Sequence, residues 1–213
     1  MKCIVSDFDG TLLDNNLENN ILRINEFVSQ ENIFVLATGR TFKSIKNAIK
    51  DYHISYDYII SSDGACIYDK NDNLIYEKTM NYDLMFKVLS IVFDINETVQ
   101  IKYDNNYDIS DSDAKVSRIL INASTDVKEK LMNELNKLDD IYAYLSTNWL
   151  NISSINSDKT VAVKYIEELH HLNKDNIFVI GNDINDFPMI KYYNGYLIGN
   201  NVQSFEEFIK KIN

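Results

Sequence analysis

The stretch Lys2-Cys3-Ile4-Val5-Ser6-Asp7-Phe8-Asp9-Gly10-Thr11 begins with a short apolar run and ends in two acidic residues. A continuous apolar run of this length is typical of a strand buried on both faces, as in a parallel sheet. Open parallel sheets bind ligands at the carboxyl ends of their strands. The stretch therefore predicts a central parallel strand over residues 2–6, with its acidic residues at the edge of the sheet.

Outward from this stretch, strand and helix patterns alternate. Apolar residues recur every three or four positions between residues 17 and 28, which is the spacing of one helix face. Further strands are predicted at residues 32–36 and 58–60, separated by a helix that Thr41 can cap. The order strand, helix, strand, helix, strand predicts a parallel sheet with right-handed crossovers.

The pattern changes after a predicted hairpin at residues 65–76. Two helices and four strands follow in an order typical of an antiparallel α+β module, and the strand–helix alternation then resumes near residue 159. We therefore expect an α/β fold. Its Rossmann-like core is formed by residues 1–79 and 153–213, and an α+β cap domain is inserted at residues 80–152.

Composition narrows the class of protein. The 213 residues are 45% hydrophobic and 25% charged, with a net charge of −11, so a nucleic-acid partner is not expected. Apolar runs stay short of the roughly 18–20 residues that a membrane span needs, and the amino-terminal run meets Asp7 too early for a signal peptide. Together with two cysteines in apolar runs, this predicts a cytoplasmic protein. Its oligomeric state stays open.

Four polar clusters are expected at the carboxyl-end edge of the sheet, although they lie far apart in the sequence. They are Asp7-Phe8-Asp9-Gly10-Thr11, Thr38-Gly39-Arg40, the helix-opening Lys159, and Gly181-Asn182-Asp183-Ile184-Asn185-Asp186. Carboxyl ends of parallel strands share one edge, so these clusters would converge. Each could also have a simpler origin, as a turn, a helix cap or, for Arg40, a structural ion pair.

The residue types in these clusters suit phosphate chemistry. Asp7 and Asp9 lie two apart, so an extended backbone would point both carboxylates to one side, where one can act as nucleophile and the other as acid and base. Gly10 allows a sharp turn that exposes backbone amides to an anion. Thr38 can donate a hydrogen bond to a phosphate oxygen, and Lys159 can offset charge on a transferred phosphoryl group.

A divalent cation would relieve the repulsion between two close carboxylates. Magnesium prefers oxygen ligands and usually keeps several waters. Asp7, the backbone carbonyl of Asp9 and an acidic residue of the 182–186 run could supply such ligands. The sequence therefore predicts Mg²⁺ as the cofactor.

This constellation resembles the haloacid dehalogenase superfamily, and within it the Cof-type sugar-phosphatase branch, which carries a type II cap. The matching segments are Asp7-Phe8-Asp9-Gly10-Thr11, Ala37-Thr38-Gly39-Arg40, Ser157-Asp158-Lys159-Thr160, and Gly181 through Asp186 followed by Phe187-Pro188-Met189. They span nearly the whole chain in the order and spacing of the family. The resemblance implies a phosphoric monoester hydrolase that acts on a small phosphorylated metabolite, such as a sugar phosphate.

The resemblance also implies roles for individual residues. Asp7 would form an aspartyl-phosphate, and Asp9 would protonate the leaving alcohol and then activate water. Thr38 and Lys159 would complete the catalytic set. The expected substrate-binding residues are Gly10, Thr11, Gly39, Arg40, Asp63 and Gly64. The expected metal ligands are Asp7, Asp9, Asn182, Asp183 and Asp186.

The chain departs from the family pattern at three positions. Asn182 stands where the family usually has aspartate, so it would bring an oxygen without a charge, or Asp183 would take the ligand role. Asp63 stands where asparagine is commoner, and Thr160 replaces a usual glycine. Three further hypotheses remain open: a phosphoacceptor signalling domain, a phosphomannomutase-like phosphotransferase, and a catalytically weakened homologue that binds phosphate esters.

Overall fold

The computed structural model describes residues 1–95, 98–104, 115–146 and 148–212. The chain divides into two compact units, one formed by Met1–Tyr76 with Asp158–Asn213 and the other by Glu77–Ser157. The sequence placed these boundaries after residues 79 and 152.

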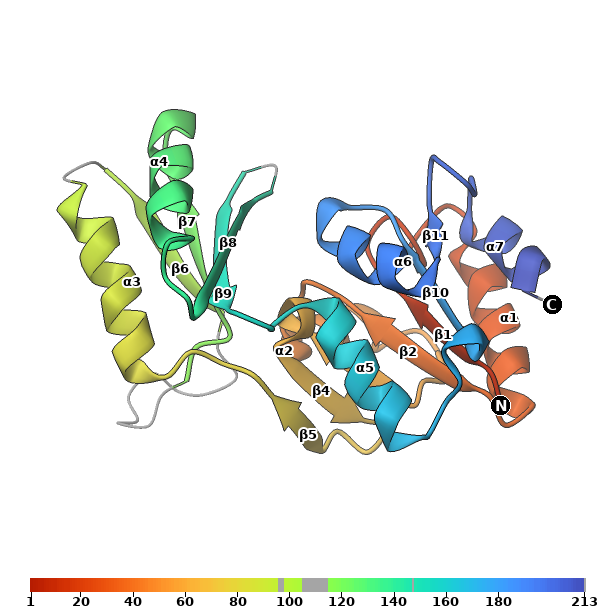
Figure 1. Cartoon of the computed structure of the whole chain (residues 1–213). Helices are drawn as coiled ribbons and strands as arrows, with labels where there is room; N and C mark the ends of the chain where they lie inside the picture. The colour runs from red at the N-terminus through yellow and green to blue at the C-terminus, as the bar shows by residue number, and fades with distance from the viewer. Residues whose placement is uncertain (96–97, 105–114, 147, 213) are drawn as a thin grey trace. The chain divides into compact units, whose positions relative to one another are not determined.

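A seven-stranded sheet forms the centre of the first unit (Figure 1). Its order is β11 (Tyr196–Leu197), β10 (Ile177–Gly181), β1 (Cys3–Ser6), β2 (Ile33–Ala37), β3 (Tyr58–Ser61), β4 (Cys66–Asp69) and β5 (Leu74–Glu77). The five strands from β11 to β3 are parallel, and β4 runs antiparallel to β3. The predicted α/β class with a parallel-sheet core is confirmed.

Helices cover both faces of this sheet because side chains alternate along each strand. Ile4 of β1 packs with α1 (Leu17–Ser29), α2 (Phe42–Ile49) and α7 (Phe205–Ile212), whereas Cys3 and Val5 pack with α5 (Lys159–Leu169) and α6 (Phe187–Tyr193). Three short 3₁₀ turns lie at Ser62–Gly64, Lys174–Asn176 and Ile184–Asp186. Thr41 caps α2 as predicted, accepting a hydrogen bond from the backbone nitrogen of Ser44.

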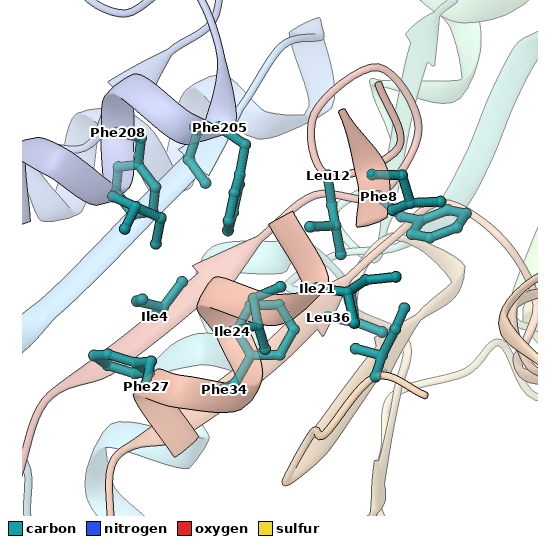
Figure 2. Packing of buried hydrophobic residues seen from close by; sticks show 14 of the residues in the cluster. Ile4, Phe8, Leu12, Ile21, Ile24, Phe27, Phe34, Leu36, Phe205 and Phe208 are labelled. Atoms are coloured by element: carbon teal, nitrogen blue, oxygen red, sulfur yellow. The ribbon is translucent and has the colours of Figure 1, made fainter. Parts of the chain in front are cut away.

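The apolar layer that contains Ile4 fixes the first strand and the loop that follows it (Figure 2). Phe8 and Leu12 lie in this loop and are almost completely buried, together with Phe34 of β2. Each such side chain contributes roughly 1.5–3 kcal/mol when fully buried. The loop after β1 is therefore held at its apolar positions, which leaves its acidic positions free to face the edge of the sheet.

The second unit is an α+β module. Its antiparallel sheet has the order β6 (Gln100–Asp104), β7 (Arg118–Asn122), β9 (Leu150–Ser154) and β8 (Ile141–Leu145). Two helices, α3 (Tyr82–Asp94) and α4 (Thr125–Leu135), share one buried apolar cluster with this sheet. In the part of the chain that the structure describes, no helix has the length and apolar character needed to cross a membrane.

Candidate active site

Asp7 lies immediately after the central strand β1 and is almost completely buried. Its backbone nitrogen donates to Ile180 O at 3.0 Å, which extends the pairing of β1 with β10 by one residue. Its carboxylate accepts a hydrogen bond at Oδ1 from Lys159 Nζ at 2.8 Å. Burial raises the pKa of Asp7 to about 6, against the lowering effect of the nearby ammonium group. The structure thus presents one carboxylate, in contact with a buried cation, at the centre of the sheet edge.

Lys159 is the first residue of α5 and is 1% exposed. The side chain of Asp158 accepts hydrogen bonds from the backbone nitrogens of Thr160 and Val161, so the helix begins at Lys159. The ammonium group of Lys159 donates to Asp186 Oδ1 at 2.7 Å, in addition to its bond with Asp7. Although burial alone would lower the pKa of this lysine, the carboxylates of Asp7 and Asp186 raise it. Lys159 is therefore charged and shared between two buried acids.

The loop after β10 is organised around Asp186, which is fully buried. Its Oδ2 accepts hydrogen bonds from the backbone nitrogens of Asn182 at 2.9 Å and Asp183 at 3.1 Å. A Cβ at Gly181 would lie 2.4 Å from the Asp186 carboxylate, so only glycine allows this close approach. Both oxygens of Asp186 are thus engaged by the protein, one by the lysine and one by the loop.

Asp9 and Arg40 form a two-pronged ion pair at the more exposed rim of the site. Arg40 Nε donates to Asp9 Oδ2 at 2.7 Å, and Nη2 donates to Oδ1 at 2.6 Å. The chain turns at the end of this stretch, where the backbone nitrogen of Thr11 donates to Phe8 O at 3.4 Å, and the carboxylate of Asp9 meets Arg40 where that of Asp7 meets Lys159. The two carboxylates consequently have separate cations, and the structural ion pair considered for Arg40 exists.

Thr38 and Gly39 follow β2 at the same edge of the sheet. Thr38 is fully buried, and its Oγ1 accepts a hydrogen bond from the backbone nitrogen of Arg40 at 3.1 Å. A Cβ at Gly39 would lie 2.9 Å from Asp63 Oδ1. Gly10 has a φ of +78°, which lets the loop after β1 turn as the sequence predicted.

Asp63 and Gly64 lie in the 3₁₀ turn after β3, which packs against the start of α5. Gly64 has a φ of +107°, and a Cβ there would lie 2.3 Å from the backbone of Asp158. Asp63 is buried, and its Oδ1 accepts a hydrogen bond from Asn185 Nδ2 at 2.7 Å. Asn185 is a residue that we did not single out from the sequence, although it lies within the Gly181–Asp186 run. The sequence signal that could have identified Asn185 is a side-chain amide, which can donate a hydrogen bond to a carboxylate such as that of Asp63.

Three oxygen-bearing groups lie close together at the end of β1, and their chemistry fits a magnesium ion. They are Asp7 Oδ2, the backbone carbonyl of Asp9 and the side-chain amide of Asn182, whose terminal atom lies 3.2 Å and 3.1 Å from the first two. Among the described residues, no group of three or more His, Cys, Asp or Glu side chains is arranged to hold a metal ion. This set has one carboxylate, one carbonyl and one amide, all of which are oxygen ligands that magnesium accepts.

Asp183, the alternative ligand, is engaged by the short turn that follows it. Its side chain is exposed, and its Oδ1 accepts a hydrogen bond from the backbone nitrogen of Ile184 at 2.7 Å. It forms a capping box with Asp186 at the start of the short turn that follows. The structure therefore brings Asn182 to the side of Asp7, whereas the contacts described for the Asp183 side chain lie within its own turn.

A model of the haloacid dehalogenase-like hydrolase family matches this chain over residues 4–115 and 94–212. The chain belongs to this family. The resemblance stated from the sequence is confirmed, and with it the assignment of the chain as a hydrolase of the phosphatase type.

Two relatives and two solved structures illustrate the match. An uncharacterized protein of Mycoplasma capricolum is 25% identical over 92% of this chain and 90% of its own length. The 5-amino-6-(5-phospho-D-ribitylamino)uracil phosphatase YcsE of Bacillus subtilis is 23% identical over 90% of this chain and 80% of its own length. The structure of a haloacid dehalogenase-like hydrolase from Bacillus subtilis has a TM-score of 0.79 and 18% identity, covering 99% of this chain and 92% of that one. TM0651 from Thermotoga maritima has a TM-score of 0.76 and 21% identity, covering 100% and 97%.

Proposed function

We propose that this protein hydrolyses small phosphate monoesters, sugar phosphates among them, through an aspartyl-phosphate on Asp7 and with Mg²⁺ as cofactor. The observation that carries the proposal is the buried Asp7 carboxylate at the end of the central strand, 2.8 Å from the buried ammonium of Lys159. A nucleophile for phosphoryl transfer needs such a fixed position and a cation beside the charge that moves.

In the proposed reaction, a carboxylate oxygen of Asp7 bonds to phosphorus while the bond to the leaving alcohol breaks. Asp9 gives a proton to that alcohol and then takes one from the water that attacks the acyl phosphate, which releases inorganic phosphate and restores Asp7. Lys159 and the Thr38 hydroxyl hold phosphoryl oxygens. Arg40 pairs with Asp9 before the substrate arrives, and we propose that it contacts the phosphate ester afterwards.

We assign Asp7, the Asp9 carbonyl and the Asn182 amide as the residues that would hold Mg²⁺, which would neutralise phosphoryl oxygens as charge develops there. Asp186 supports the site by holding Lys159 and the 182–183 backbone. Asp183 stays outside the ligand set in this proposal because its carboxylate caps a turn.

The unit Glu77–Ser157 is proposed as the cap that selects the substrate. The relative from Bacillus subtilis is named for a phosphorylated ribityl compound, which supports testing sugar and sugar-alcohol phosphates first. We further propose a cytoplasmic location, supported by two buried cysteines, Cys3 and Cys66, that are not joined in a disulfide.

The test is a panel of phosphate esters with Mg²⁺ and with a chelator. Asp7→Asn should lower turnover by on the order of 10⁴-fold or more, whereas Asp9→Asn should accumulate a phosphorylated protein detectable by mass spectrometry. Asp14→Asn is the matched control, because this carboxylate lies in the same loop but accepts from Asn16 and Asn20 instead of Lys159.

Hydrolysis that survives Asp7→Asn would refute the nucleophile. An isomerised phosphate ester as product would instead identify a phosphotransferase, and tight ester binding without turnover would identify the weakened homologue. A phosphorylated wild-type protein that persists for hours would point to a phosphoacceptor.

A further inference from the structure

The side chain of Asn182 lies at the end of β10, among three oxygen atoms of the loop after β1. When its amide nitrogen faces this loop, Nδ2 donates to Thr11 Oγ1 at 3.0 Å, Asp9 O at 3.1 Å and Asp7 Oδ2 at 3.2 Å. When the amide is turned over, Oδ1 accepts from Thr11 Oγ1 at 3.0 Å. A Cβ at Gly10 would lie 2.5 Å from this amide, so the loop wraps closely around it.

These two orientations are not equivalent, because two of the three neighbours can only accept. The carbonyl of Asp9 and the ionised carboxylate of Asp7 have no hydrogen to donate. Facing them with the amide nitrogen makes hydrogen bonds, whereas facing them with the amide oxygen sets three oxygens against one another unless a cation lies among them. The Thr11 hydroxyl serves both orientations, since it can accept from nitrogen or donate to oxygen.

We propose that Asn182 is a two-state ligand whose amide nitrogen bridges Asp7 and Asp9 in the metal-free protein and whose amide oxygen turns inward when a divalent cation binds. The inference rests on the metal site of the proposed function. It concerns a rotation about the Cβ–Cγ bond and involves no titration. An ionised aspartate at position 182 could not make the metal-free bridge, because it has no hydrogen to donate.

The consequence is that the site keeps its shape without the cation, at the expense of cation affinity. Binding the cation requires the bridging hydrogen bonds to break, and the oxygen that replaces them carries no charge. Asn182→Asp should therefore bind Mg²⁺ roughly tenfold or more tightly, because ligand charge tunes divalent-cation affinity. In a chelator it should lose about 2–4 °C in Tm, from the loss of the bridge and the repulsion between carboxylates.

The first experiment uses the wild-type protein and the NMR signal of the Asn182 side-chain amide, assigned by its loss in Asn182→Ala. In a chelator, this amide should exchange its hydrogens slowly, and titration with Mg²⁺ should shift the signal and speed the exchange. The internal control is the amide of Asn73, which donates to the carboxylate of Asp69 at 2.9 Å. That pair lies at the opposite edge of the sheet, because Asp69 pairs with Tyr58 at the start of β3, and its signal should not respond.

The second experiment compares Asn182→Asp, Asn182→Ala and the matched control Asn73→Asp by calorimetric Mg²⁺ titration and by thermal unfolding in a chelator. We expect the aspartate variant to gain affinity and lose metal-free stability, and the alanine variant to lose both. The control should lose only stability, since it also replaces an exposed amide beside a carboxylate. Tighter Mg²⁺ binding by Asn182→Asp with unchanged metal-free Tm, or an Asn182 amide signal that ignores Mg²⁺, would overturn the proposal.

These outcomes separate the inference from the proposed function. If the wild-type protein binds no Mg²⁺, the metal in the proposed function fails, and the two-state ligand fails with it. If Mg²⁺ binds and phosphate esters are hydrolysed while the amide signal stays fixed, the function stands and the inference alone fails.

Discussion

Replacing Lys159 by methionine should be the most destabilising change in the site. The side chain is 1% exposed, and its ammonium group is the cation that Asp7 and Asp186 share at 2.8 Å and 2.7 Å. Methionine fills a similar volume, so the cost comes mainly from leaving two buried carboxylates without a counter-charge. Removing one partner of a buried ion pair costs about 3–5 kcal/mol, which corresponds to a Tm loss of roughly 6–20 °C for a protein of this size.

The assay is thermal unfolding in a chelator at pH 7, with a double-mutant cycle as its control. Lys159→Met combined with Asp186→Asn should recover part of the loss, because one uncompensated charge is gone while an oxygen remains for the 182–183 backbone. The combination with Asp7→Asn should recover stability in the same way. A Tm loss below about 3 °C for Lys159→Met, or losses that simply add in the double variants, would refute the ion-pair reasoning.

The remaining predictions concern pH, the rim ion pair and a glycine. Folding raises the pKa of Asp7 from 3.8 to about 6, so the unfolded chain loses this proton at a lower pH than the folded protein does. The free energy of unfolding of the wild type, relative to that of Asp7→Asn, should therefore fall by about 3 kcal/mol as pH rises between those two values. Chemical denaturation in a chelator measures this free-energy difference, and a difference between the two proteins that stays constant with pH would contradict the prediction. Arg40→Ala should raise KM for a phosphate ester while changing Tm by less than about 4 °C, since the ion pair of Arg40 with Asp9 is partly exposed. A larger Tm loss would show that Arg40 has a structural role. Gly64→Ala should lower the free energy of unfolding by more than about 3 kcal/mol. The control Gly199→Ala, at a φ of +80° with open space around it, should lower it by about 1 kcal/mol. Equal losses would show that the close approach of Gly64 to α5 does not matter.

The order of elements was predictable because it rests on local patterns. The strand that ends just before Asp7, the helix of residues 17–28 and the cap at Thr41 all follow from apolar spacing or from a single hydrogen-bonding side chain. The convergence of the four polar clusters was predictable in outline, since parallel strands bring their carboxyl ends to one edge.

The partners within the site were not predictable, because they depend on distances between segments far apart in the sequence. The sequence suggested that the carboxylates of Asp7 and Asp9 point to one side, and only the structure shows that Asp7 contacts the buried Lys159 and Asp9 the half-buried Arg40. Likewise, Asn185 meets Asp63 across 122 positions of sequence.

The fold class, the family and the set of acids, amides and cations at the sheet edge follow from residue types and short-range spacing, so they could be predicted before any packing was known. Which oxygen faces which cation depends on how the loops pack against one another, and it became known from the folded structure. That structure placed both oxygens of Asp186 in internal bonds and brought the amide of Asn182 to Asp7. The physical reason is that hydrogen bonds form over about 3 Å, a distance that only the packed sheet and its loops can set.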